Sequence, residues 1–158
     1  MKERRDDGGP ALFRLVRFWS RRWAGRASQE LTGEPRHIQH ILVVEAVATN
    51  AYPSGAAPAA GAHEAITVGT VAHQLGLDHS GASRMVRDTV DAGYLARATS
   101  EHDRRRASLR LTDSGQELLA GARRWQRQAF EELTASWAEH DRRQFASYLQ
   151  RLADDVGA

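Results

Sequence analysis

Serines and arginines share one face of the segment 80–91 if this segment forms a helix. At about 100° per residue, that face collects Ser80, Gly81, Ser83, Arg84 and Arg87. An arginine fork can bond the O6 and N7 atoms of guanine in the major groove of DNA. Hydroxyl groups near a helix N-terminus suit phosphate oxygens, because free N–H groups and the helix dipole favour anions there. Gly81 keeps the start of the helix narrow. The face therefore predicts a helix that reads duplex DNA.

The opposite side of this helix is apolar and is predicted to pack on the preceding helix. It carries Ala82, Met85, Val86, Thr89 and Val90. A second interpretation of the polar side stays open. Arg84 and Arg87 could simply be solvated, with Arg87 paired to Asp91 one turn later. The residues of this helix do not decide between the two interpretations.

A cluster of arginines follows where the pattern changes from helix to strand. Residues 94–96 and 107–111 are short strand candidates, and the segment between them is polar. The tip of this predicted β-hairpin carries Asp103, Arg104, Arg105 and Arg106. Adjacent cations repel one another and gain nothing from packing, whereas a salt bridge from Asp103 can hold one arginine in a fixed direction. An arginine held in this way can enter a narrow minor groove, where the negative potential is strongest.

The segment before the hairpin predicts a helix-turn-helix. A short strand and a helix are expected over 66–77, and a second helix over about 78–92. Thr67 suits the N-cap of the first helix, and Gly76 suits its C-terminal end. Gly93 closes the second helix. Two helices joined by so few residues must cross at a steep angle, as in a helix-turn-helix.

Amphipathic helices are predicted on both sides of this segment. The N-terminal side contains a helix over 11–30 and another over about 36–50. On the C-terminal side, Asp113 and Gln116 have capping-box spacing at the start of a long helix, and Asp141 begins the last helix. One small domain could not cover all the apolar stripes of these helices, and a soluble monomer rarely exposes patches of that size. A second copy of the chain is therefore the predicted partner.

Residues 66–119 resemble the DNA-binding core of the MarR family over their whole length. The matching motifs are LGL-x-x-S-x-x-S-R from Leu75, GYL from Gly93, D-x-R from Asp103 and LT-x-x-G from Leu111 to Gly115. The resemblance implies that the serine and arginine face belongs to a recognition helix. It also implies that Asp103 orients Arg105 at the tip of the wing, and that a homodimer reads two half-sites about one helical turn apart.

This sequence departs from the family pattern near the first helix of the helix-turn-helix. The loop at 51–65 is longer than we expect for the family. Thr70 stands where many members have a glutamate after the N-cap, which predicts a weaker cap. Neither difference removes an element that reads DNA.

The resemblance also implies control by a small molecule, since MarR-like proteins are commonly displaced from DNA by aromatic acids or phenols. Their ligands usually lie between the dimerisation helices and the winged domain. The candidate residues are Trp19, Trp23, His37 and His40, because tryptophan rings and histidine donors suit a planar anion. The competing interpretation is that the tryptophans belong to the core and that the histidines face solvent at the start of a helix.

No metal site or cofactor is predicted. His37 and His40 lack a firmly placed third ligand, and the chain has no cysteine. The absence of cysteine also excludes disulfides and control by thiol oxidation. An enzyme is the alternative class of function, but the sequence contains no nucleophile elbow, glycine-rich phosphate loop or HExxH motif. We therefore expect no catalytic residue.

The 158 residues predict a mainly α fold with a small β-wing, an α+β winged helix-turn-helix core with dimerisation helices at both ends. The expected parts are a disordered tail over 1–10, a dimerisation region formed by 11–50 and 113–156, a flexible loop over 51–65 and the winged domain over 66–112. No secretory signal or apolar span is visible, so a cytoplasmic location is expected.

The predicted function is that of a dimeric transcription regulator that binds a pseudo-palindromic duplex site in DNA. A repressor released by a small ligand is the simplest form of it. The alternative within the same fold is an architectural DNA-binding protein without sequence preference or ligand response.

Overall fold

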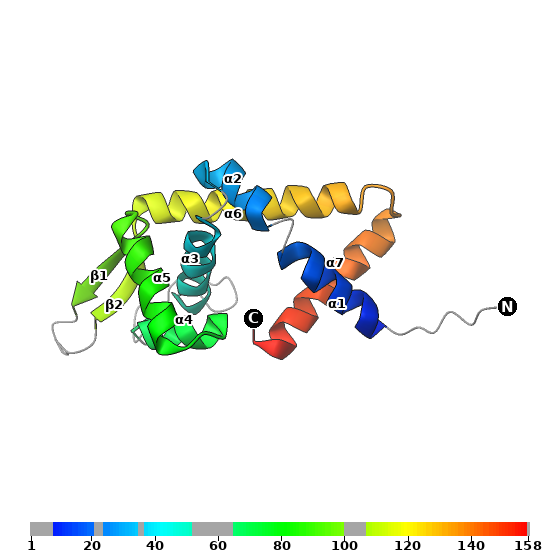
Figure 1. Cartoon of the computed structure of the whole chain (residues 1–158). Helices are drawn as coiled ribbons and strands as arrows, with labels where there is room; N and C mark the ends of the chain where they lie inside the picture. Colours follow the sequence, from blue (N-terminus) through cyan, green and yellow to red (C-terminus); the bar gives the residue numbers. More distant parts are fainter. Residues whose placement is uncertain (1–7, 21–23, 35–36, 52–64, 100–106, 158) are drawn as a thin grey trace. The chain divides into compact units, whose positions relative to one another are not determined.

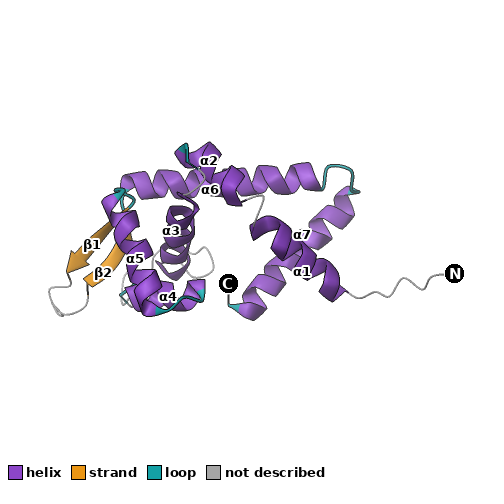
Figure 2. Ribbon diagram, in the orientation of Figure 1, coloured by secondary structure: helices purple, strands orange, loops and turns teal. Residues whose placement is uncertain are grey.

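The computed structural model of the chain describes residues 8–20, 24–34, 37–51, 65–99 and 107–157. Their elements, in chain order, are α1 (Gly8–Phe18), α2 (Ala24–Thr32), α3 (Ile38–Ala51), α4 (Val68–Leu75), α5 (His79–Asp91), β1 (Leu95–Thr99), β2 (Ala107–Leu111), α6 (Asp113–Leu133) and α7 (Glu139–Val156) (Figure 1). The fold is mainly helical with one small antiparallel sheet (Figure 2), as the sequence predicted. Among these described helices, none is both long and apolar enough to cross a bilayer.

The chain forms two compact units, one ending at Ile38 and one beginning at Gln39. In the first unit, the predicted single helix over 11–30 is wrong, because the structure has α1 and α2 in its place. α1 leaves α-helical geometry in a π-helical turn at Trp19 and Ser20. The predicted disordered tail is also wrong for its last three residues, since α1 begins at Gly8. Pro10 fits in this first turn, where a helix needs no N–H bond.

The helix-turn-helix has the predicted caps. The Thr67 hydroxyl accepts a hydrogen bond from Thr70 N at 3.2 Å, and Gly76 ends α4 with a φ of 63°. Thr70 also returns a bond, because its hydroxyl accepts from Thr67 N at 3.1 Å. The capping box is therefore complete with threonine in the glutamate position. Asp78 caps α5 by accepting from Gly81 N.

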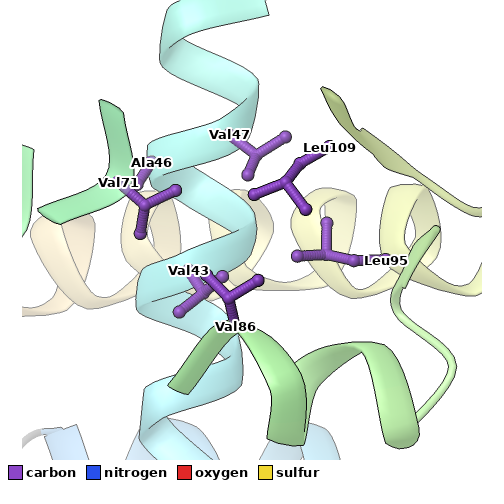
Figure 3. Packing of buried hydrophobic residues seen from close by; sticks show 7 residues of the cluster. All are labelled: Val43, Ala46, Val47, Val71, Val86, Leu95 and Leu109. Carbon is purple, nitrogen blue, oxygen red and sulfur yellow. The ribbon is translucent and has the colours of Figure 1, made fainter. Parts of the chain in front are cut away.

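The core of the second unit surrounds α3. Val43 and Val47 of this helix are fully buried. The side chains that contact them and Ala46 come from four elements: Val71 of α4, Val86 of α5, Leu95 of β1 and Leu109 of β2 (Figure 3). Each fully buried side chain of this kind contributes roughly 1.5–3 kcal/mol. The two helices and the hairpin are thus held on one face of α3.

The hairpin is the wing predicted from the sequence. β1 and β2 pair antiparallel with Leu95 opposite Leu111 and Arg97 opposite Leu109. The short strand predicted at the start of 66–77 is wrong, since residues 65–67 form no strand. A single backbone bond, from Leu109 N to Ile66 O at 2.7 Å, joins this segment to β2.

The LT-x-x-G motif anchors α6 to the end of α5. Thr112, rather than the predicted Asp113, is the N-cap of α6, and its hydroxyl accepts from Gly115 N at 3.1 Å. The same hydroxyl donates to the Gly93 carbonyl at 2.6 Å. The backbone of Gly115 passes so close to the Tyr94 carbonyl that any Cβ there would overlap it. Only glycine permits this close approach.

α6 and α7 are joined by a short turn. The C-cap of α6 is Thr134, whose N–H donates to the Phe130 carbonyl at 3.1 Å. The last helix begins at Glu139 after an Ala138 N-cap without a side-chain bond, so the predicted start at Asp141 is wrong by two residues. The acidic side chains of the first turn, Glu139 and Asp141, still favour a helix start there.

A half-buried carboxylate joins α3 to α6. Glu45 Oε1 accepts a hydrogen bond from Gln126 Nε2 at 2.5 Å. Burial raises the pKa of Glu45 above its ordinary value of 4.5, and the Gln126 bond and the charge of Arg123 oppose that shift. The contact therefore contains a charge that is partly removed from water.

Gly115→Ala is expected to lower the free energy of unfolding by about 1–3 kcal/mol, because backbone or strand must move to admit the methyl group. Urea unfolding followed by circular dichroism measures this. The control is Gly25→Ala on α2, where an added Cβ meets no atom within 4 Å. This control should be neutral or stabilising by up to about 1 kcal/mol. Equal stability of Gly115→Ala and the natural chain would contradict the close approach.

Glu45→Gln is expected to stabilise the protein at neutral pH. Since burial raises the pKa of Glu45 in the folded state, folding favours the protonated carboxyl, and stability falls as pH rises from 4.5 through the raised pKa. The advantage of the glutamine variant should therefore shrink as pH falls towards 4.5. Parallel urea titrations across this range measure it, with Glu117→Gln at an exposed position of α6 as control. An advantage that grows in acid would overturn the assignment.

Candidate nucleic-acid interface

Helix α5 has one buried side, which confirms the predicted division of its residues. Ala82, Val86 and Thr89 are fully buried, and Met85 and Val90 are half-buried. This side packs on α4 and β1. This packing fixes the rotation of α5 about its own axis. It therefore also fixes the direction in which the opposite face of α5 points.

The opposite face presents the predicted polar residues to solvent. Ser80, Arg84 and Arg87 are exposed, while Gly81 and Ser83 are half-buried. No ion pair joins Arg87 to Asp91, which was the alternative use of this arginine. Within the described part of the chain, the guanidinium groups of Arg84 and Arg87 form neither hydrogen bonds nor ion pairs. Their donors are therefore available to an external acceptor.

Gly81 has a local reason to be glycine. Its N–H donates to Asp78 Oδ2 at 3.3 Å. A Cβ at this position would lie 2.8 Å from Asp78 Oδ1, so the N-cap side chain would have to move. The sequence-based reason, a narrow helix start for close approach to DNA, stays a prediction beside this structural one.

The end of α5 is tied to α3 by a buried polar contact that the sequence did not indicate. His40 Nδ1 lies 3.0 Å from Thr89 Oγ1, and the Thr89 hydroxyl donates to the Met85 carbonyl at 2.7 Å. Thr89 must then accept from His40, which places a proton on Nδ1. The His40 ring also lies against Tyr94, with centroids 5.6 Å apart. His40 is only 5% exposed, so the expectation that it faces solvent is wrong.

The other predicted ligand residues belong to the first unit. His37 Nε2 lies 3.5 Å from Glu34 Oε2, and its side chain is partly exposed. Trp19 is half-buried. Trp23 lies outside the described residues. The described residues contain no group of three metal-ligating side chains. A role of Trp19 and His37 in ligand binding stays a prediction.

The wing adds two cations that the sequence-based list did not contain. Arg97 on β1 and Arg110 on β2 are exposed. The alternation of buried and exposed side chains along a strand could have indicated Arg110, which neighbours the buried Leu109. The predicted tip residues Asp103, Arg104, Arg105 and Arg106 lie outside the described part of the chain.

This arrangement of helices and hairpin is that of a winged helix-turn-helix protein. The model of the MarR family matches residues 59–106. That segment includes α4, α5 and β1. No curated protein matches the chain.

Solved structures of MarR-type proteins match nearly the whole chain. A MarR family protein from Bacillus stearothermophilus has a TM-score of 0.68 at 18% identity, covering 100% of this chain and 99% of its own. A MarR transcriptional regulator from Methanosarcina mazei Go1 has a TM-score of 0.67 at 19% identity, with 94% of each chain covered. The S. aureus MepR–DNA complex has a TM-score of 0.59 at 16% identity, with 94% and 96% covered. The family match and this shared fold confirm the MarR resemblance seen in the motifs.

Proposed function

We propose that the chain is a sequence-specific DNA-binding transcription regulator that acts as a homodimer. The MarR-family fold supports DNA-binding transcription regulation in general. The observation that carries the specific proposal is the pair of exposed guanidinium groups of Arg84 and Arg87, which have no partner among the residues that the structure describes. They lie on a helix whose other side is fully committed to the core. Two cations on one helix face without a partner in the described part of the chain suit an anionic or guanine-bearing partner.

In this proposal α5 enters the major groove. Arg84 and Arg87 bond guanine edges, and Ser80 and Ser83 near the N-terminus of the helix contact phosphates. The S. aureus MepR structure is a DNA complex of a protein with the same fold, which supports DNA as the partner.

The wing supplies the second contact. We propose that Arg105, oriented by Asp103, enters the minor groove, with Arg104 and Arg106 beside it. Arg97 and Arg110 on the strands are placed to meet phosphates. Several phosphate contacts per subunit imply that binding weakens steeply as salt rises.

The helices outside the winged domain are proposed to form the dimer. α1 and α7 contain no buried residue in the single chain. The exposed apolar side chains of α7 are Tyr148 (59%), Leu149 (40%), Leu152 (42%) and Val156 (68%). Those of α1 are Leu12, Phe13, Leu15, Val16 and Phe18. A second copy that covers such faces explains why they are apolar. The winged domain is then residues 66–112, and the proposed dimerisation region is formed by 11–50 and 113–156.

We propose repression as the mode of action, since a bound dimer can block a promoter without a further activation surface. Release by a small ligand follows the family resemblance, and aromatic acids and phenols are the first compounds to test. Trp19, Trp23 and His37 remain the proposed contacts, whereas His40 is already buried against Thr89 and Tyr94. Such a ligand changes DNA binding only if its affinity differs between two conformations of the dimer that hold the two recognition helices at different distances. A DNA partner places the protein in the cytoplasm.

Arg84→Ala and Arg87→Ala should each weaken binding to a selected duplex site by about 1–3 kcal/mol and relax base preference at particular positions. Selection of bound duplexes from a random pool provides the site, and competitive gel shifts measure the affinities. Arg105→Ala should weaken binding most at sites flanked by A·T runs. Arg151→Ala on α7 is the control, because its side chain is 78% exposed on a helix outside the winged domain.

Two results would contradict this assignment. If the three winged-domain variants bind like the natural protein, the DNA-binding face is elsewhere. If the natural protein binds every fragment equally, rather than preferring its site by at least about 10³-fold, the architectural alternative holds.

Leu149→Glu should dissociate the dimer. In a two-fold interface each substitution occurs twice, so losing the burial of one leucine per copy costs about 3–6 kcal/mol. Sedimentation velocity over a range of concentrations should show an increase of roughly 10²- to 10⁴-fold in the dimer Kd. Gln150→Glu, which adds the same charge at the neighbouring exposed position, is the control. Monomeric natural protein, or equal dissociation of both variants, would contradict the α7 interface.

A further inference from the structure

A buried hydrogen bond joins α3 to the turn of α5 that carries Arg87. His40 Nδ1 of α3 donates to the Thr89 hydroxyl at 3.0 Å, and that hydroxyl donates to the Met85 carbonyl at 2.7 Å. Arg87 lies midway between Met85 and Thr89 in the sequence. The turn from which the Arg87 side chain extends is therefore held at both ends through one hydroxyl group.

This contact is removed from water. Thr89 is fully buried and His40 nearly so. A buried donor that loses its acceptor is costly, so the His40–Thr89 bond is retained in the folded protein. Threonine in a helix has two common rotamers, and the His40 donor favours the observed one. A threonine hydroxyl that bonds the carbonyl four residues earlier also bends a helix slightly. His40 therefore influences the local geometry of α5.

The chain that follows α5 fixes the same contact. The His40 and Tyr94 ring centroids are 5.6 Å apart. Tyr94 N donates to the Thr89 carbonyl at 3.2 Å, and the Tyr94 carbonyl accepts from Thr112 N at 3.1 Å. Thr89 is thus bonded through its hydroxyl and its carbonyl. The direction of the His40 donor is set by these neighbours.

Reading a base edge demands more of Arg87 than contact with a phosphate does. A pair of bonds to guanine O6 and N7 requires two N–H groups to be aligned at once, and hydrogen bonds weaken steeply at angles below about 120°. Phosphates carry no sequence information, and contacts to them are made with any sequence. A small rotation of this turn of α5 therefore weakens base preference before it weakens the general attraction to duplex DNA.

We propose that His40 is a positioning residue for DNA recognition, which acts through Thr89 to direct Arg87 at a base edge. The inference rests on the proposed function, because it concerns the base preference of the same helix face. His40 itself touches no DNA, since it is buried against Thr89 and Tyr94. The bond between α3 and α5 thereby contributes to specificity as well as to stability.

Hydrogen exchange in the DNA-free protein tests the structural step. His40→Leu removes the donor, and we expect the amides of residues 87–91 to exchange about tenfold faster relative to those of α4. His40→Asn, whose Nδ2 can donate in place of Nδ1, should restore the natural rate. The control is Val44→Ala, at a fully buried position of α3 outside the core cluster that includes Val86 of α5. It should leave the ratio of the two rates unchanged.

A double-mutant cycle on the selected duplex site tests the functional step. His40→Leu should lower the preference at the base that Arg87→Ala relaxes by about threefold to tenfold, and should change the affinity for unrelated fragments by less than about twofold. Arg87→Ala should then cost correspondingly less in the His40→Leu background. Arg84→Ala, one turn earlier, should cost as much as in the natural protein.

Additive effects of His40→Leu and Arg87→Ala would overturn the positioning role. Equal loss of preference in His40→Asn would overturn the part of the hydrogen bond. If His40→Leu does not fold, Thr89→Val removes the same bond from α5 and must show the same loss of preference. Unaltered exchange at 87–91 would overturn the structural step whatever the DNA result. A natural protein without a preferred site would overturn the proposed function and the role in base preference, whereas the exchange rates would still decide whether His40 holds this turn.

Discussion

The burial of one side of α3 is the interaction on which the rest of the second unit depends. Val43 and Val47 are fully enclosed, and the side chains that enclose them come from both helices of the helix-turn-helix and from both strands of the wing. None of these four elements is long enough to be stable alone, since isolated helices of about 12–15 residues are marginal in water and isolated hairpins are no better. Their geometry is therefore a consequence of a shared contact with α3, and the polar face of α5 and the wing keep a fixed relation to each other.

Polar contacts then fix the positions of helices that apolar packing alone would leave free to shift. Valine and alanine surfaces can slide by small amounts, whereas a hydrogen bond in a buried place must be made or lost. The His40–Thr89 bond fixes the C-terminal half of α5 against α3. The Thr112 hydroxyl fixes the turn after α5 against the start of α6. Both bonds act at the end of α5 away from Ser80, so neither of them holds its N-terminal half.

The sequence predicted most of the winged domain because its signals are local. The period of α5, the αL residue Gly76 and the Thr67 cap each depend on a few neighbouring residues. The errors have non-local causes. Thr112 rather than Asp113 caps α6 because its hydroxyl also reaches Gly93, nineteen positions earlier in the chain. His40 is buried because Thr89 and Tyr94 supply partners that no periodicity reveals. The Glu45–Gln126 contact was missed for the same reason, since these two side chains meet only through the packing of α3 on α6.

α6 connects the hairpin to the last helix, α7. Its 21 residues span about 30 Å at 1.5 Å per residue. Gly115 holds its start against the turn after α5, Gln126 bonds its middle to α3, and its far end exposes Leu133. A helix held at its start and middle moves with the winged domain as one body. If the far end and α7 hold a second copy, the separation of the two recognition helices is set by the angle of α6. A small change in the angle at which α6 meets α3 is then multiplied along the length of α6.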